Sequence, residues 1–391
     1  MEFPSNHNNF EPKHFDAILA RIAEIKQSHP DNNIAIQVFD RNYFNTLNES
    51  QKLRLLKCLN AGLQNPDCKI GSYAMNTSDY VEFMPFFQAV IEKHHKVDLS
   101  KLNHTSSWDL SQIEDLPSNG ILDITELSLP EVSMRIRVAR NIEKYPLPGI
   151  MTKEHRINFE KDMKAIFDTL TTDPNYAGKY YSLTPDHECF INQKEYNKLV
   201  DSHYMFKNMT SDSNLVAAGI ANDWPYGRAC YISADKESIV WIGEEDHLRI
   251  MCMKKGSVLN QVFDKLKNLV DLIESRLENG CKKSDVYGVV TSCPTNIGTS
   301  MRVSVHIPLP NLTSDGTVDK VIEICEPLGL AVRGIGGEGT PIGVDGTVDI
   351  SPSKRFCVSE AEILNILFKG IRLLKEKEDQ CPKMSGMLKS F

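Results

Sequence analysis

Residues 132–139 read Val-Ser-Met-Arg-Ile-Arg-Val-Ala, and their apolar and polar side chains alternate with a period of two. Because successive side chains of a strand point to opposite faces of a sheet, this stretch predicts a half-buried strand. Arg135 and Arg137 then lie side by side on the polar face. The stretch therefore predicts a sheet with basic side chains on one face.

Four further stretches have the composition of strands: 239–243, 286–292, 301–307 and 331–334. In 301–307 the alternation places Arg302, Ser304 and His306 on one face. Two helices are expected among these strands: one after Ser257, ending at Gly280, and one that begins with a capping box at Ser359.

The first hundred residues have a different period. Apolar residues recur at helical spacing from Phe15 to Ile25, and again within 51–63 and 80–95. The polar, proline-containing segment 96–119 is typical of a linker. We therefore expect a small helical domain followed by a large α+β domain.

Composition limits the classes of function. The 391 residues carry 44 basic and 52 acidic side chains, a net charge of −8 at pH 7, which argues against a nucleic-acid or anionic-membrane binder. No signal-peptide core or membrane-spanning run is evident, so we expect a cytoplasmic protein. The ten cysteines form no CxxC pair and no zinc-ligand spacing, which predicts reduced thiols.

Two groups of residues have open interpretations at this point. The acidic run 244–246 follows a predicted strand and is either a solvated turn or a site. The arginines in or beside predicted strands are Arg135, Arg137, Arg249, Arg302 and Arg333. Such arginines need partners, and either an ion-pair network or a bound polyphosphate would provide them.

The segment Thr291 to Thr299 places Cys293 after an apolar strand and before Pro, Thr, Asn and Gly. Backbone amides of a tight turn and the Thr295 hydroxyl can stabilise a thiolate. A buried, inert cysteine fits the same composition.

The sequence Cys-Pro-Thr-Asn-Ile-Gly-Thr at 293–299 resembles the signature of the phosphagen (guanidino) kinases around their reactive cysteine. The segments 133–141, 241–250, 301–307 and 332–338 resemble further blocks of that family, in the family's order. The resemblance implies an α+β fold: a small all-helical N-terminal domain and a large domain with a mainly antiparallel β-sheet flanked by helices. The expected divisions are a polar tail 1–15, a helical domain 16–98 with a guanidino-specificity loop 67–78, a linker 99–130 and a catalytic domain 131–391.

The resemblance also implies roles for residues. The catalytic residues would be Glu245, Cys293 as a thiolate, and Glu338. Residues on the nucleotide would be Arg135, Arg137, His203, Arg249, Arg302, His306, Arg333 and Asp349. The substrate would contact Lys69, Ile70 and Tyr73 as well as Glu245, Cys293 and Glu338.

The reaction implied is reversible transfer of the ATP γ-phosphate to a guanidine nitrogen. ATP or ADP is the co-substrate, and Mg²⁺ is held mainly by phosphate oxygens, without a metal site of protein ligands. The glycine-rich loop 334–346 and the loop 67–78 are expected lids that exclude water. Arginine kinases resemble this chain at Glu338 and Tyr73, so L-arginine is the expected substrate.

Alternatives stay open. Lys69 and His94 depart from the arginine-kinase pattern, and His94 is similar to the residue of some taurocyamine kinases, which suggests taurocyamine or hypotaurocyamine. A protein-arginine kinase and an inactive nucleotide-binding scaffold are further alternatives. The expected partner is a small guanidine, with no nucleic acid or membrane, and the protein is expected to be a monomer or a homodimer.

Overall fold

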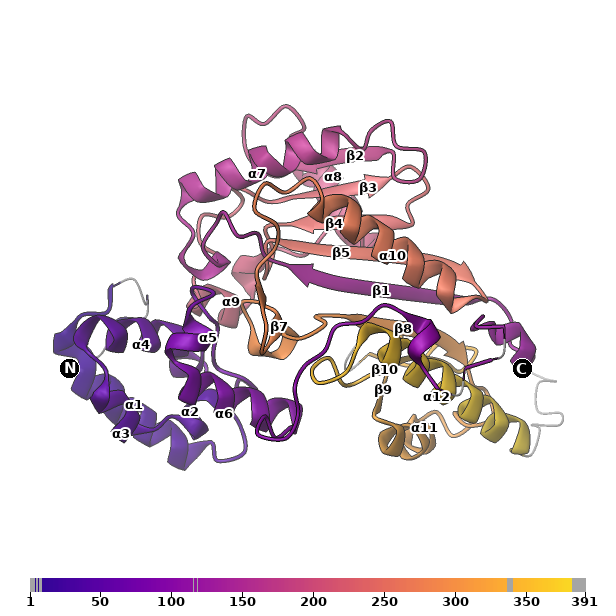
Figure 1. Ribbon diagram of the computed structural model, residues 1–391, viewed down its shortest axis with the longest axis horizontal. Helices are drawn as coiled ribbons and strands as arrows, with labels where there is room; N and C mark the ends of the chain where they lie inside the picture. Colours follow the sequence, from indigo (N-terminus) through magenta and orange to yellow (C-terminus); the bar gives the residue numbers. More distant parts are fainter. Residues whose placement is uncertain are drawn as a thin grey trace, which may run out of the picture. The chain divides into compact units, whose positions relative to one another are not determined.

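The first hundred residues fold into helices, as Figure 1 shows in indigo to violet. The computed structural model describes residues 4, 6, 9–114, 116–117, 119–335 and 340–381. The helices of this region are α1 (Phe15–Ser28), α2 (Ile34–Val38), α3 (Arg41–Thr46), α4 (Glu49–Gln64), α5 (Asp79–Glu82) and α6 (Met84–His95). Their buried residues are mostly apolar, such as Ile18, Leu59 and Phe87. This confirms the predicted small helical domain.

The stretch 80–95, expected as one helix, is divided. Phe83, with φ −109° and ψ 36°, separates α5 from α6, and Pro85 stands in the first turn of α6. Proline has no N–H to donate to the preceding turn, so a continuous helix would lose a hydrogen bond and clash there.

Eight strands form one sheet in the order β2-β3-β4-β5-β1-β8-β10-β9. Their bounds are β1 (Val132–Arg140), β2 (Gly178–Ser182), β3 (Ala229–Ser233), β4 (Ser238–Ile242), β5 (Leu248–Gly256), β8 (Arg302–Pro308), β9 (Leu330–Arg333) and β10 (Thr347–Pro352). The pairs β2–β3, β3–β4, β1–β8, β8–β10 and β9–β10 are antiparallel. The predicted α+β fold with a mainly antiparallel sheet is thus confirmed.

The remaining helices belong to the same part of the chain as the sheet. They are α7 (Lys153–Asp168), α8 (Gln193–Asp201), α9 (Ser213–Ala217), α10 (Leu259–Glu274), α11 (Asp319–Cys325) and α12 (Glu360–Gln380). Ser359 caps α12 through the capping box with Glu362 that the sequence predicts. In 286–292, however, only β7 (Gly288–Val289) is extended, and it pairs with β6 (Lys283–Ser284) in a separate two-stranded sheet.

The chain divides into two compact units. Unit 1 comprises residues 1–104, 139–250 and 271–300, and unit 2 comprises 105–138, 251–270 and 301–391. In unit 2, α12 contacts β8, β9 and β10. The segment expected as a linker belongs to this unit from residue 105 onward, where Trp108 packs on Phe263 with ring centroids 4.9 Å apart. The boundaries 1–15, 16–98, 99–130 and 131–391 stay predictions.

Candidate active site

One face of the sheet in unit 2 collects most of the residues predicted to bind nucleotide. In antiparallel strands, residues directly opposite one another lie on the same face. The registers are Ser133↔His306, Arg135↔Ser304, Arg137↔Arg302, Asp349↔His306 and Asp349↔Arg333. These pairs therefore place Arg135, Arg137, Arg302, Arg333, His306 and Asp349 on one face.

This arginine face, as we call these six residues, has an internal acidic partner. The Asp349 carboxylate lies 3.0 Å from Arg302 Nη2 and 3.8 Å from His306 Nε2. Arg135 Nη2 contacts the Met251 sulfur at 3.1 Å. The six residues include four guanidinium groups, whose planar donors suit the oxygens of a polyanion.

The remaining predicted nucleotide residues lie in unit 1. Arg249, at the start of β5, forms an ion pair of 2.9 Å with Glu244, and its guanidinium lies 5.3 Å from the centroid of the Trp241 ring. His203 is exposed in the turn after α8, where it adopts φ +60°. On the open question about the arginines, Arg249 and Arg302 take part in ion pairs, and the binding of a polyphosphate stays a prediction.

Glu245 and Cys293 are brought together in unit 1. Glu245 Oε2 lies 3.4 Å from Arg249 Nη2 and 3.5 Å from Asn296 Nδ2, and Asn296 belongs to the short 3₁₀ helix η7 (Pro294–Asn296) that follows Cys293. Both distances are long for hydrogen bonds. A carboxylate can accept two parallel hydrogen bonds from a planar cation, which is the role predicted for Glu245.

The environment of Cys293 favours the neutral thiol. The Sγ atom lies 3.2 Å from Thr295 Oγ1, the contact that the sequence suggested. Burial and the Glu245 carboxylate nevertheless raise the pKa of Cys293 far above that of a free cysteine, and the Thr295 hydrogen bonds oppose this only in part. The role of Cys293 as a thiolate stays a prediction. A cation bound beside Glu245 would lower the pKa again.

Tyr73 lies within electrostatic reach of the same two groups. Burial raises the pKa of Tyr73, and the nearby Cys293, Glu245 and Asp212 raise it further. Ala74, the next residue along the loop, donates a hydrogen bond from its backbone N–H to the Ser292 carbonyl at 2.7 Å. The predicted specificity loop and the cysteine segment are thus joined directly.

Two of the predicted substrate residues are held by their backbone. The carbonyl groups of Lys69 and Ile70 accept hydrogen bonds from the N–H groups of residues 34 and 35, at 3.1 and 2.9 Å. The Lys69 side chain is exposed and Ile70 is buried. This bonding makes the loop part of the helical bundle, so any closure of this expected lid moves the loop together with its helices. Residues 336–339 of the glycine-rich loop, the other expected lid, lie outside the described residues, and Glu338 is among them.

Two supporting clusters were not predicted from the sequence. Asn141 donates from Nδ2 to Asp246 Oδ1 at 2.7 Å and accepts from the His247 N–H at 2.9 Å, while Asp246 Oδ1 also accepts from the Ser292 N–H at 2.7 Å. This cluster fastens the Glu245 turn to the residue before Cys293. Asp246 is the last residue of the acidic run 244–246, but its partner Asn141 is more than a hundred residues away in the sequence.

The second cluster centres on Asp79, whose side chain is fully buried. Its carboxylate accepts from the backbone N–H groups of Met75 and Asn76, both at 2.7 Å, and from Arg54 Nε at 2.6 Å. Cys58, whose thiol lies 3.6 Å from Asp79, accepts from the Tyr73 N–H at 3.0 Å through its carbonyl. Asp79 therefore fixes the end of the loop that carries Tyr73.

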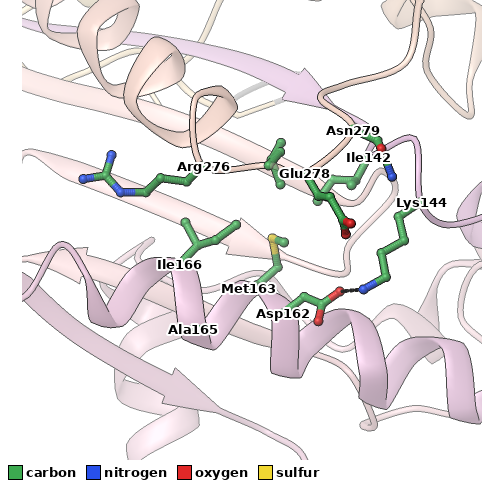
Figure 2. A pocket seen from close by; sticks show the side chains of 10 residues that line it. Ile142, Lys144, Asp162, Met163, Ala165, Ile166, Arg276, Glu278 and Asn279 are labelled. Carbon is green, nitrogen blue, oxygen red and sulfur yellow. Dashed lines mark hydrogen bonds and ion pairs between the residues drawn. The ribbon is translucent and has the colours of Figure 1, made fainter.

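Two surface pockets in the described part of unit 1 are lined by residues outside the predicted site. One, of about 200 Å³, lies between α7 and the residues that follow α10. Figure 2 shows its ion pair, in which Lys144 Nζ lies 2.6 Å from Asp162 Oδ2. Another, of about 340 Å³, lies around Lys164, Tyr181 and Cys189.

Family profiles match both parts of the chain. The profile of the ATP:guanido phosphotransferase N-terminal domain matches residues 26–92, and that of the C-terminal catalytic domain matches 158–381. The chain belongs to the ATP:guanido phosphotransferase family, the phosphagen kinases. It is therefore a phosphagen kinase whose co-substrate is ATP or ADP, as the resemblance implied.

Known phosphagen kinases are similar over most of the chain. The arginine kinase of Polybetes pythagoricus is 34% identical over 347 residues, which cover 88% of this chain and 91% of the relative. The arginine kinase of Anthopleura japonica is 36% identical over 84% of this chain, and the chain spans only 43% of that relative. The solved structure of the substrate-free duplicated taurocyamine kinase from Schistosoma mansoni is similar with a TM-score of 0.77 and 29% identity, covering 92% of this chain and 49% of that one.

In the described part of the chain, every helix is too short or too polar to traverse a lipid bilayer. All ten cysteines lie among the described residues, and none forms a disulfide.

Proposed function

We propose that this phosphagen kinase transfers the γ-phosphate of ATP reversibly to the guanidinium group of L-arginine. The observation that carries the proposal is that hydrogen bonds join the Cys293 segment both to Glu245, through Asn296, and to the loop of Tyr73, through Ser292. A carboxylate that accepts two hydrogen bonds, a thiol and a phenol suit the planar, cationic end of a guanidino compound.

Glu245 would orient the guanidinium and accept a proton from the attacking nitrogen. A guanidinium is a poor nucleophile because its charge is delocalised, so loss of this proton makes the nitrogen reactive. Cys293 would act through charge, as a thiolate that forms once the guanidinium is bound. Glu338 would provide the second carboxylate.

The arginine face, with Arg249 and His203, would bind the nucleotide. Guanidinium donors suit the phosphate oxygens and the charge that spreads over them in the transition state. Mg²⁺ would be held by phosphate oxygens and water, since magnesium is commonly bound through nucleotide phosphates. Asp349 would leave Arg302 for the ribose side when nucleotide enters.

L-Arginine is favoured over creatine by the carboxylate expected at Glu338 and by Tyr73. Taurocyamine or hypotaurocyamine is the second candidate, because the exposed cation of Lys69 suits a sulfonate as well as a carboxylate. His94 also favours this second candidate, because it is similar to the residue of some taurocyamine kinases. It packs edge-on against His95 with ring centroids 4.6 Å apart. His95 Nε2 in turn lies 2.9 Å from the carbonyl oxygen of Pro294, the residue after Cys293. A protein-arginine kinase would not need the Tyr73 loop, and an inactive scaffold would not need Glu245 and Cys293.

The test is a coupled assay of ADP release with Mg·ATP. The panel is L-arginine, creatine, glycocyamine, taurocyamine, hypotaurocyamine and lombricine, each tried with the wild-type protein and with Glu245→Gln. We expect the highest kcat/KM on L-arginine and its loss in the variant. Preference for a sulfur-containing guanidine would overturn L-arginine, and nucleotide binding without turnover on any guanidine would favour the scaffold.

A further inference from the structure

Asp212 lies at the substrate end of the candidate site, although nothing in its sequence context pointed there. After burial, the charges of neighbouring groups raise the pKa of Tyr73: Cys293 has the largest effect of these, Glu245 the next and Asp212 the third. The Asp212 carboxylate is therefore within electrostatic reach of the Tyr73 side chain.

Hydrogen bonds place the two segments on the same support. Helix α4 carries both the Tyr73 loop and α9, the helix that Asp212 precedes. The Cys58 carbonyl accepts from the Tyr73 N–H at 3.0 Å, while Asn65 Nδ2 donates to the Ser213 carbonyl at 3.1 Å and Asn60 Nδ2 donates to that of Ala217 at 2.8 Å. Asp212, next to Ser213, is therefore held at the end of α4 from which the loop 65–73 departs.

The Asp212 carboxylate has one oxygen occupied and one available. Oδ1 accepts from the N–H groups of Asn214 and Leu215 at 2.9 and 3.1 Å. Oδ2 accepts no hydrogen bond from the described residues, and the side chain is exposed. The capping bonds fix the position of the carboxylate and leave Oδ2 open to a ligand.

The charges at this end of the site have opposite signs. Lys69 provides an exposed cation in the loop, and Asp212 provides an exposed anion at its base. An α-amino acid carries an ammonium and a carboxylate on the same carbon, so it matches both. A guanidino acid without the amine presents only an anion, which Asp212 repels.

We propose that Asp212 binds the α-ammonium of the guanidine substrate, and that it thereby selects guanidino α-amino acids over guanidino acids that lack the amine. The inference rests on the proposed function, because it identifies the far end of the substrate whose guanidinium meets Glu245.

The experiment compares L-arginine with 5-guanidinopentanoate, which is arginine without its α-amino group. Asp212→Asn is the variant, since asparagine keeps an oxygen that caps α9 and removes the charge. Asp40→Asn is the matched control: Asp40 is an exposed aspartate that caps α3 through the Asn42 N–H at 2.7 Å. Each protein is assayed for ADP release on both substrates.

In the wild type we expect a kcat/KM on L-arginine at least 10-fold above that on the analogue. Asp212→Asn should lower kcat/KM on L-arginine by about 10- to 100-fold, mainly through KM, as expected for the loss of one charge-assisted hydrogen bond. Turnover of the analogue should stay within about twofold, or rise as the repulsion is removed. Asp40→Asn should behave as the wild type.

An equal loss on both substrates would overturn the inference, because it would mean that Asp212 only holds α9 in place. Unchanged activity on L-arginine would overturn it as well. If the wild-type protein fails to use L-arginine but uses taurocyamine, the proposed substrate is wrong. If it uses L-arginine and the analogue equally well, the proposed substrate stands and the role of Asp212 is wrong.

Discussion

Glu245 lies between Arg249 and the short helix that follows Cys293. Its contacts with Arg249 and Asn296, at 3.4 and 3.5 Å, are at the limit of hydrogen bonding. Glu244 takes the shorter contact with Arg249, at 2.9 Å. Glu244 thus makes the closer ion pair with Arg249, and binding of the guanidinium by Glu245 stays a proposal.

Replacement of Glu245 by Gln should reduce kcat by about 10²- to 10⁴-fold, because the amide accepts no proton from the attacking nitrogen. Steady-state kinetics with L-arginine measure the loss, and circular dichroism checks the fold. The exposed Glu154→Gln on α7 is the control. Turnover of the Glu245 variant near the wild-type value would remove the proposed role.

Cys293 should react slowly with iodoacetamide at neutral pH in the absence of substrate. Its raised pKa keeps the thiolate fraction small, so the rate should increase about tenfold per pH unit from pH 7 to 9 without levelling off. Mass spectrometry of the peptide that contains Cys293 measures the rate, and the unfolded chain gives the reference for an ordinary thiol. A rate that becomes constant below pH 8 would mean that the thiolate is already stable in the free protein.

At the scale of single elements, the loop that carries Tyr73 depends on one buried carboxylate. The Asp79 carboxylate accepts hydrogen bonds from the backbone N–H groups of Met75 and Asn76 and from the guanidinium of Arg54. Asp79→Asn should raise KM for the guanidine substrate about tenfold and leave KM for ATP within about twofold, since it displaces the loop and no proposed nucleotide residue.

Asp98→Asn, at a side chain that is 48% exposed, is the matched control for Asp79. Initial rates with each substrate varied in turn separate the two KM values. An equal rise of both values, or a loss of activity that follows unfolding alone, would contradict a specific effect on the loop.

The arginine face is a property of strand register. Arg302→Lys keeps the charge on this face and loses the planar fork that binds two phosphate oxygens. We expect ATP affinity to fall about tenfold or more, measured by isothermal titration in the absence of guanidine. The exposed Arg372→Lys on α12 should bind as the wild type does. Unchanged affinity of the Arg302 variant would place Arg302 outside the phosphate site.

Sequence patterns predicted the elements with clear periodicity. Strand β1 follows its alternation, and α12 begins at its capping box. Strand β5 was missed because apolar Met251 and Cys252 interrupt its alternation and both are buried. Periodicity detects strands with one wet face, so a stretch buried on both faces gives no such signal.

At the scale of the whole chain, a contact between distant segments ties the expected linker to unit 2. The buried Glu360 carboxylate, in the first turn of α12, accepts from Ser106 Oγ at 3.0 Å and from the Ser107 N–H at 2.9 Å. The Ala361 N–H donates to the Ser107 carbonyl at 3.0 Å. The segment that leaves the helical domain is therefore fastened to a helix more than 250 residues later.

Glu360→Ala should lower the free energy of unfolding by about 1–3 kcal/mol, because it leaves the Ser107 N–H without its acceptor. Urea unfolding measures the change, with the exposed Glu376→Ala as control. Activity per folded molecule should stay at the wild-type value. A change in kcat without a change in stability would instead give Glu360 a role in the reaction.

The sequence by itself indicated the fold class, the family and the candidate residues of the reaction, because periodicity, capping boxes and the segment around Cys293 are local properties of the chain. Only the tertiary structure showed the raised pKa of Cys293, the gathering of six residues on the arginine face, and the attachment of the Asp212 segment to α4 beside the Tyr73 loop. Burial, strand register and hydrogen bonds between distant segments set these features. They depend on which segments meet in the folded protein, and no single stretch of sequence encodes that.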